Sequence, residues 1–261
     1  PGGQYAKPLA DSHADTAPDA QFRIGRDLRR RAEQAGVRIE SATIVWGGFA
    51  PDEIAALVRC QAVTYRPARL ILAPGAHEAP TPLPGWTLPG VMTTGALQTL
   101  VHAQRVCPGE RVLIGGSGPL NLQLACELLA CGVRPIAVVE AAPRPGLAAW
   151  RDAWRMLRAA PDLLWDGAAM LLRLRRAGVP VLWSSHVVAA EAAADPARVG
   201  AVRIAGPDGE QTLTADAVAL NLGFQPETGL ARALGVPHRF VDRGLGHLAT
   251  EADADGRTAL G

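Results

Sequence analysis

The stretch that most constrains the fold of this chain is "RVLIGGSGPLNLQLACELL", residues 111–129. An apolar run of strand length leads into Gly116 and Gly118, and a segment with helical character follows. A glycine turn between a strand and a helix brings backbone amides and the positive end of the helix dipole to one point, where they can bind an anion. The stretch therefore predicts a strand–turn–helix unit that binds a phosphate group.

The individual residues of the turn refine this prediction. Gly116 permits the tight backbone turn, and Gly118 lets a pyrophosphate approach the backbone because it has no Cβ. Pro119 suits the first helical position, where a missing N–H costs little. Asn121 stands where the pattern expects a third glycine, and we expect it to loosen the packing of helix on strand without blocking the phosphate.

A carboxylate completes the pattern. Glu140 closes "RPIAVVE", the next predicted strand, at the distance expected of an acid that binds a ribose hydroxyl. Glu140 favours NAD over NADP. The nearby Arg144 blurs this preference, although it is more simply explained as a surface arginine. The alternative is a unit whose glycines only form a sharp turn and whose Glu140 is solvated.

Strand and helix patterns alternate through the middle of the chain, which predicts an α/β fold. We expect a Rossmann-like parallel sheet with a small antiparallel sheet. Helices are predicted over 21–36, 95–106, 146–160 and 167–179, the second capped by Thr94. One or two short strands are predicted within 37–48, and a pair of strands within 53–66, although the first half of that segment also fits a helix. Further strands are predicted over 69–76, which we expect to be buried, and within 112–116, 135–140, 180–192, 199–206 and 211–223.

Composition excludes several classes of partner. The 26 basic and 25 acidic residues leave a net charge of +1, so the chain has no basic field for nucleic acid. No apolar run approaches the ~20 residues of a transmembrane helix, and no signal peptide is visible. None of the four cysteines forms a C-x-x-C pair, so we expect reduced, mostly buried thiols, no metal site and a cytoplasmic protein.

Four segments in this order resemble one family: "PGGQ", "LILAPGAHEAPTPLPGWTLPGVMTTGALQTL", "VLIGGSGPLNLQLACELL" and "ALNLGFQPETGLARALG". They are similar to the FAD-dependent pyridine nucleotide-disulfide oxidoreductase superfamily. The "PLPGWTLPGVMTTGALQTL" stretch is the most specific, and it resembles the large flavoprotein subunit of heteromeric amine dehydrogenases and oxidases. That group includes opine oxidase, hydrogen cyanide synthase, L-proline dehydrogenase and the alpha chain of sarcosine oxidase.

The resemblance implies FAD as cofactor and a second site for NAD or another adenine nucleotide. It places Gly2, Gly3 and Gln4 along the FAD loop and Gly75 where the backbone approaches FAD. His77, beside that loop, is expected to be a surface residue. The expected domains are a partial FAD-binding domain over 1–95, an NAD(P)-binding-like Rossmann domain over 108–222 and a return to the FAD-binding domain over 223–261. The family's first nucleotide-binding unit and its C-terminal FAD motif are not in the sequence, so we expect an internal fragment that is inactive alone.

The function implied is that of one subunit in a flavin-dependent oxidoreductase. It would transfer electrons from an amine or amino-acid substrate through FAD, beside a second flavoprotein subunit. Two alternatives remain: an NAD(P)H-dependent flavin reductase of two-domain type, and a non-enzymatic nucleotide-binding subunit. No catalytic acid, base or nucleophile can be assigned from the sequence, because no hydrolase triad or paired-carboxylate pattern is present.

Overall fold

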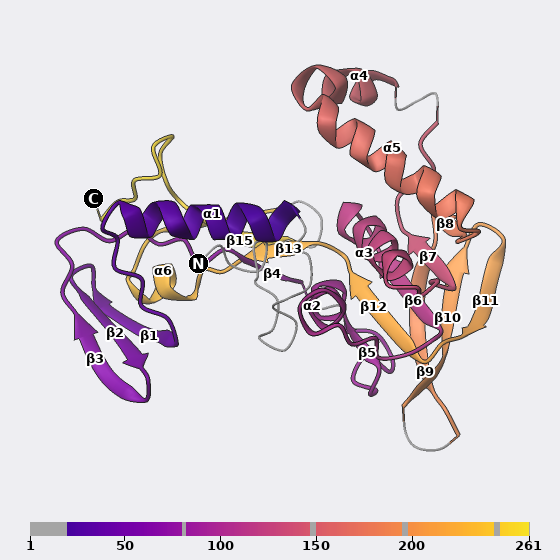
Figure 1. The fold of residues 1–261 in the computed structure, drawn as a ribbon, viewed down its shortest axis with the longest axis horizontal. Helices are drawn as coiled ribbons and strands as arrows, with labels where there is room; N and C mark the ends of the chain where they lie inside the picture. Colours follow the sequence, from indigo (N-terminus) through magenta and orange to yellow (C-terminus); the bar gives the residue numbers. More distant parts are fainter. Residues whose placement is uncertain (1–19, 80–81, 147–149, 195–197, 243–245, 261) are drawn as a thin grey trace. The chain divides into compact units, whose positions relative to one another are not determined.

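The computed structural model describes residues 20–79, 82–146, 150–194, 198–242 and 246–260 (Figure 1). The chain forms two compact units. One contains the described residues up to His77 together with those from Phe224 onward, and the other contains the described residues from Glu78 to Gly223. Each unit has its own sheets and is considered by itself.

The larger unit, residues 78–223, is built on a five-stranded parallel sheet with strand order β5-β12-β6-β7-β8. Its strands are β5 (Val91–Thr93), β6 (Val112–Gly116), β7 (Ala137–Glu140), β8 (Val181–Trp183) and β12 (Ala217–Asn221). Its helices are α2 (Thr94–Gln104), α3 (Pro119–Ala130), α4 (Trp150–Ala159) and α5 (Pro161–Arg176). A three-stranded antiparallel sheet consists of β9 (His186–Ala192), β10 (Val199–Gly206) and β11 (Gly209–Thr214).

The alternation of side chains along β6 explains the three layers of this unit. Val112 and Ile114 point into a core that also contains Leu97 of α2, Leu124 of α3 and Leu174 of α5. Leu113, between them in sequence, points to the other face, in a second core with residues of β9 and β10, among them Val202 and Ile204. Both faces of the parallel sheet are therefore covered, as its nearly continuous apolar strands require. The predicted fold class is confirmed.

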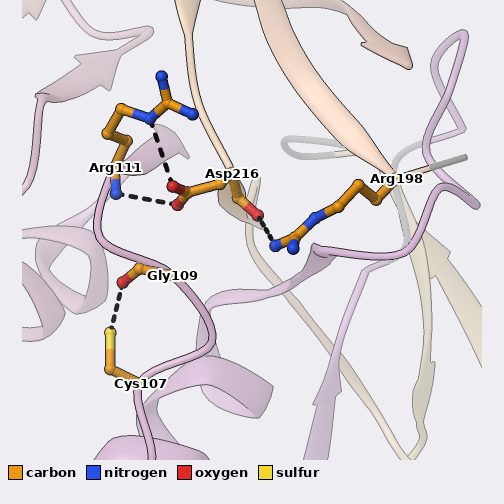
Figure 2. A network of polar contacts seen from close by, with 5 residues as sticks. All are labelled: Cys107, Gly109, Arg111, Arg198 and Asp216. Carbon is orange, nitrogen blue, oxygen red and sulfur yellow. Dashed lines mark hydrogen bonds and ion pairs between the residues drawn. The ribbon is translucent and has the colours of Figure 1, made fainter. Parts of the chain in front are cut away.

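Asp216 links the amino-terminal ends of β6 and β12, which are adjacent strands (Figure 2). Its carboxylate accepts hydrogen bonds from the backbone N of Arg111 at 2.9 Å and from the Nε of Arg111 at 3.3 Å. The backbone oxygen of Asp216 accepts a bond from Arg198 Nη2 at 3.3 Å. In the same loop, the Cys107 thiol donates to the carbonyl of Gly109 at 2.9 Å. The two bonds between Arg111 and Asp216 therefore connect the residues that directly precede β6 and β12.

The smaller unit contains α1 (Ala20–Gln34) and α6 (Gly229–Ala233). Its strands are β1 (Thr43–Ala50), β2 (Glu53–Val58), β3 (Gln61–Tyr65), β4 (Ala76–Glu78), β13 (Phe224–Pro226), β14 (His238–Val241) and β15 (His247–Thr250), and Glu78 at the end of β4 already belongs to the larger unit. Strands β1 to β3 form an antiparallel sheet, and β4 pairs with β13 and β14 with β15. Helix α6 packs on β1 at Gly48, where an added Cβ would lie 2.9 Å from Leu230 and from Leu234.

Two local predictions are wrong. The segment 69–76 is predicted as a buried strand, but residues 69–75 form no strand, β4 begins only at Ala76, and Ile71 is 90% exposed. A strand needs a neighbour to satisfy its backbone, and no described strand pairs with residues 69–75. The cap of α2 is Thr93 and not Thr94: the Thr93 side chain accepts from the backbone N of Ala96, while Thr94 is the first helical residue and fully buried.

Candidate functional site

The candidate site lies at the carboxyl edge of the parallel sheet, where β6, β7 and β12 end side by side. Gly116, the last residue of β6, is in register with Glu140 on one neighbouring strand and with Asn221 on the other. Strand β6 lies between β7 on one side and β12 on the other. The order of the strands across the sheet therefore reverses its direction at β6. A crevice at such a reversal is where open α/β sheets bind their ligands.

Gly116 is a glycine because another backbone approaches it. A Cβ at this position would lie 1.7 Å from the carbonyl oxygen of Asn221, and the φ of +137° also disfavours any other residue. The next amide, that of Ser117, donates to the same Asn221 oxygen at 2.8 Å. The tight turn predicted from the sequence therefore exists, and its tightness comes from contact with β12.

Gly118 differs from Gly116 in what surrounds it. Its φ is +110°, yet a Cβ built there would meet no atom within 4 Å. Gly118 is the N-cap residue of α3, and Pro119 follows at the start of the helix. The bend is thus open on the side where the helix begins and is not filled by side chains, which is the geometry that an approaching phosphate needs.

The carboxylate of Glu140 is buried directly against this turn, with 4% of the residue exposed. Its Oε1 accepts from the hydroxyl of Ser117 at 2.8 Å and from the backbone N of Ala142 at 3.0 Å. Its Oε2 accepts from the backbone N of Gly118 at 3.1 Å. Since each carboxylate oxygen can accept two bonds, Oε2 has one acceptor position that no described residue uses.

The alternative of a solvated Glu140 does not match this burial. The role of Gly116, Gly118 and Glu140 in binding a nucleotide nevertheless remains a prediction. Arg144, the residue that could favour a 2′-phosphate, is exposed.

Sequence reasoning missed a set of polar residues beneath the turn. Asn121, expected only to loosen packing, is 1% exposed, accepts from the Thr94 hydroxyl at 2.8 Å and donates to the Asn221 carbonyl at 3.4 Å. The side chain of Asn221 donates to the Glu78 carboxylate, whose other oxygen accepts from the backbone N of Gly95 at 2.8 Å. Asn121 and Asn221 are 100 positions apart, so no local pattern could have indicated this contact.

Of the remaining predicted positions, Gly75 and His77 lie in the smaller unit. Gly75 is exposed with φ +81°, and a Cβ there would meet no atom within 4 Å, which fits a place where a ligand approaches the backbone. A cavity of about 290 Å³ beside it is lined by His77, Glu227, Arg232 and His247 among other residues. His77 Nδ1 lies 3.7 Å from a carboxylate oxygen of Glu227, and about half of each side chain is exposed. The predicted FAD-loop residues Gly2, Gly3 and Gln4 lie outside the described residues.

The cysteines are free, as expected, but they are not mostly buried. Cys60, Cys107 and Cys131 are exposed, and Cys126 alone is buried. Burial raises the pKa of the Cys126 thiol above its ordinary value, with a smaller opposing effect from Arg173.

Within the described ranges, no three His, Cys, Asp or Glu side chains are placed to bind a metal ion, and no described helix has the length and apolar character to cross a bilayer.

The chain is similar to one protein family model and to several known proteins. A model of the pyridine nucleotide-disulphide oxidoreductase family matches residues 48–245. The hydrogen cyanide synthase subunit HcnB of Pseudomonas protegens is 34% identical over 259 residues, which cover 97% of this chain and 51% of that protein. A subunit of opine oxidase from Rhizobium meliloti is also 34% identical, over 94% of this chain and 54% of that protein.

Among solved structures, an FAD-dependent pyridine nucleotide-disulphide oxidoreductase from Desulfovibrio vulgaris is similar with a TM-score of 0.56 and 25% identity. The alignment covers 83% of this chain and 50% of that one. The chain thus spans about half the length of the curated relatives that it matches.

Proposed function

Because the chain belongs to the pyridine nucleotide-disulphide oxidoreductase family, we propose that it is part of an FAD-dependent oxidoreductase that takes electrons from an amine or amino-acid substrate. The observation that carries the proposal is the alignment of nearly the whole chain, at 34% identity, with subunits of hydrogen cyanide synthase and opine oxidase. Both relatives are named as subunits, so we also propose that the partner of this chain is a second flavoprotein subunit.

The chemistry in this proposal is that of the flavin, which accepts a hydride equivalent when FAD is bound. The residues of this chain would bind and orient the FAD and the nucleotide. Gly75 leaves its backbone accessible in the smaller unit, where the resemblance places FAD. In the larger unit, the open bend at Gly118 and the fixed carboxylate of Glu140 support a second site for NAD or another adenine nucleotide.

Flavin reduction in the full-length protein, purified with its partner subunit, tests the electron donor. We expect visible flavin absorbance that bleaches anaerobically on addition of an amine or amino acid. Bleaching by NADH alone would instead identify the second candidate, an NAD(P)H-dependent flavin reductase, which the intact glycine turn favours. Absence of flavin, with nucleotide binding retained, would overturn both in favour of a non-enzymatic subunit.

The nucleotide site has its own test, the substitution Gly118→Val. We expect affinity for ADP or NADH to fall about tenfold or more, since a branched side chain would occupy the space the phosphate needs. Gly209→Val is a matched control, because Gly209 also has positive φ, +101°, and no atom within 4 Å of an added Cβ, but lies in the β10–β11 hairpin. Equal affinity in the two variants, measured by isothermal titration calorimetry, would remove the assignment of the site.

A further inference from the structure

Asn121 occupies the place of the third glycine, and its surroundings show that it does more than fill space. Both polar atoms of its side chain are engaged, Oδ1 by the Thr94 hydroxyl and Nδ2 by the Asn221 carbonyl. Thr94 is 0% exposed and Asn221 is 2% exposed, so water cannot replace either partner. A buried amide with both ends satisfied is held in one orientation.

The direction of these bonds fixes which way the amide points. The Thr94 oxygen lies 2.8 Å from Oδ1, which can only accept, so the hydroxyl must donate. The Nδ2 group of Asn121 is then directed at the Asn221 carbonyl. Thr94, at the start of α2, thereby determines that Asn121 of α3 directs its Nδ2 group at the end of β12.

The Asn221 carbonyl is the support on which the glycine turn rests. It accepts a hydrogen bond from the Ser117 amide at 2.8 Å. It also lies so close to Gly116 that a Cβ on that residue would clash with it. The Asn221 side chain is itself held, because it donates to Glu78 and accepts from the backbone N of Gly223 at 3.0 Å. A shift of this carbonyl would therefore move the Gly116–Ser117 peptide, which leads directly into the Gly118 bend.

We propose that Asn121 is a positioning residue of the nucleotide site. Its Nδ2 group holds the Asn221 carbonyl in place, and that carbonyl holds the Ser117 amide, so that the Gly118 bend keeps its open shape. The part of the inference that concerns ligand affinity rests on the proposed nucleotide site, whereas the part that concerns the rigidity of the turn does not. A simple packing role predicts the opposite response to glycine, since glycine is the residue that the pattern expects at this position.

The test uses two substitutions in the full-length protein, Asn121→Gly and Asn121→Asp. Glycine removes the support, and aspartate is nearly isosteric but turns an acceptor toward the Asn221 carbonyl. We expect the Ser117 amide to exchange with solvent about tenfold faster in both variants and the dissociation constant for ADP to rise about tenfold. Thr94→Val should act in the same direction with a smaller effect.

Gln123→Ala is the matched control, because Gln123 lies on the same helix and donates to Glu127 at 2.9 Å, away from the turn. The control should leave Ser117 exchange and ADP affinity unchanged. Unaltered exchange in Asn121→Gly, relative to this control, would overturn the proposal. If the wild-type protein does not bind ADP, the nucleotide site fails as a function, and the exchange comparison still decides whether Asn121 positions the turn.

Discussion

Strands β6 and β12 are joined by polar contacts at both ends, and the two ends are built differently. At the amino end, Asp216 binds Arg111 with side chains that are 21% and 54% exposed (Figure 2). At the carboxyl end, Asn121, Asn221 and Glu140 are at most 4% exposed. Water can replace a lost partner at the first end but not at the second, so we expect substitutions to cost much more at the carboxyl end.

The largest effect is expected for Gly116→Ala. The added methyl would lie 1.7 Å from the Asn221 carbonyl oxygen at a φ of +137°, so β6 and β12 would have to separate. We expect a loss of about 4 kcal/mol or more in the free energy of unfolding, measured by urea denaturation. A stable Gly116→Ala protein would show that the two strands can separate at this end. It would contradict the expectation that substitutions cost more at the carboxyl end than at the amino end.

Glu140→Gln should have the next largest effect. The substitution turns an amide toward donors that now face a carboxylate, so at least one of Ser117, Gly118 and Ala142 loses its acceptor. We expect a cost of about 2 kcal/mol, since the group is buried, and weaker nucleotide binding. Glu210→Gln is the control: Glu210 is exposed and lies 3.9 Å from Arg203, so its loss should cost about 0.5 kcal/mol or less.

Asp216→Asn tests the amino end. It weakens the bonds to the backbone N and the Nε of Arg111, and we expect a cost of about 1 kcal/mol because that guanidinium is largely exposed. The difference from wild type should shrink in high salt, which screens exposed charges. If Asp216→Asn cost more free energy of unfolding than Glu140→Gln, the amino end would be the more sensitive end, which is the reverse of what we expect.

Arg198→Ala should have the smallest effect. Arg198 donates one bond, at 3.3 Å, to the backbone oxygen of Asp216. Water can take the place of this bond, so the free energy of unfolding should fall by about 0.5 kcal/mol or less. Thermal denaturation, whose error is of similar size, checks this. A larger cost would mean that the exposed network acts cooperatively.

The sequence predicted the parts of the site that depend on neighbours in the chain. Gly116, Gly118, Pro119 and Glu140 follow from a strand, a turn, a helix and a second strand in order. The structure brings these residues together, and nucleotide binding at this turn stays a prediction. What could not be predicted depends on contacts across long separations, such as that between Asn121 and Asn221, 100 positions apart.

The errors have the same origin. Residues 69–76 have the composition of a strand, but composition does not say whether another strand will pair with them. Thr93 and Thr94 are both suitable caps, and the choice between them was made by burial of Thr94 against Asn121, on a helix 27 positions away. Local patterns thus define which elements can form, and distant partners decide which residues in them are used.

The chain crosses into the larger unit at Glu78 and leaves it at Gly223, and these two crossings are neighbours: the amide of Ala79 donates to the Gly223 carbonyl at 3.0 Å. Rejoining the surrounding chain after removal of residues 78–223 would therefore require almost no loop, and the entropic cost of closure would be small. Adjacent entry and exit points are what allows a compact unit to be inserted within the chain of another domain.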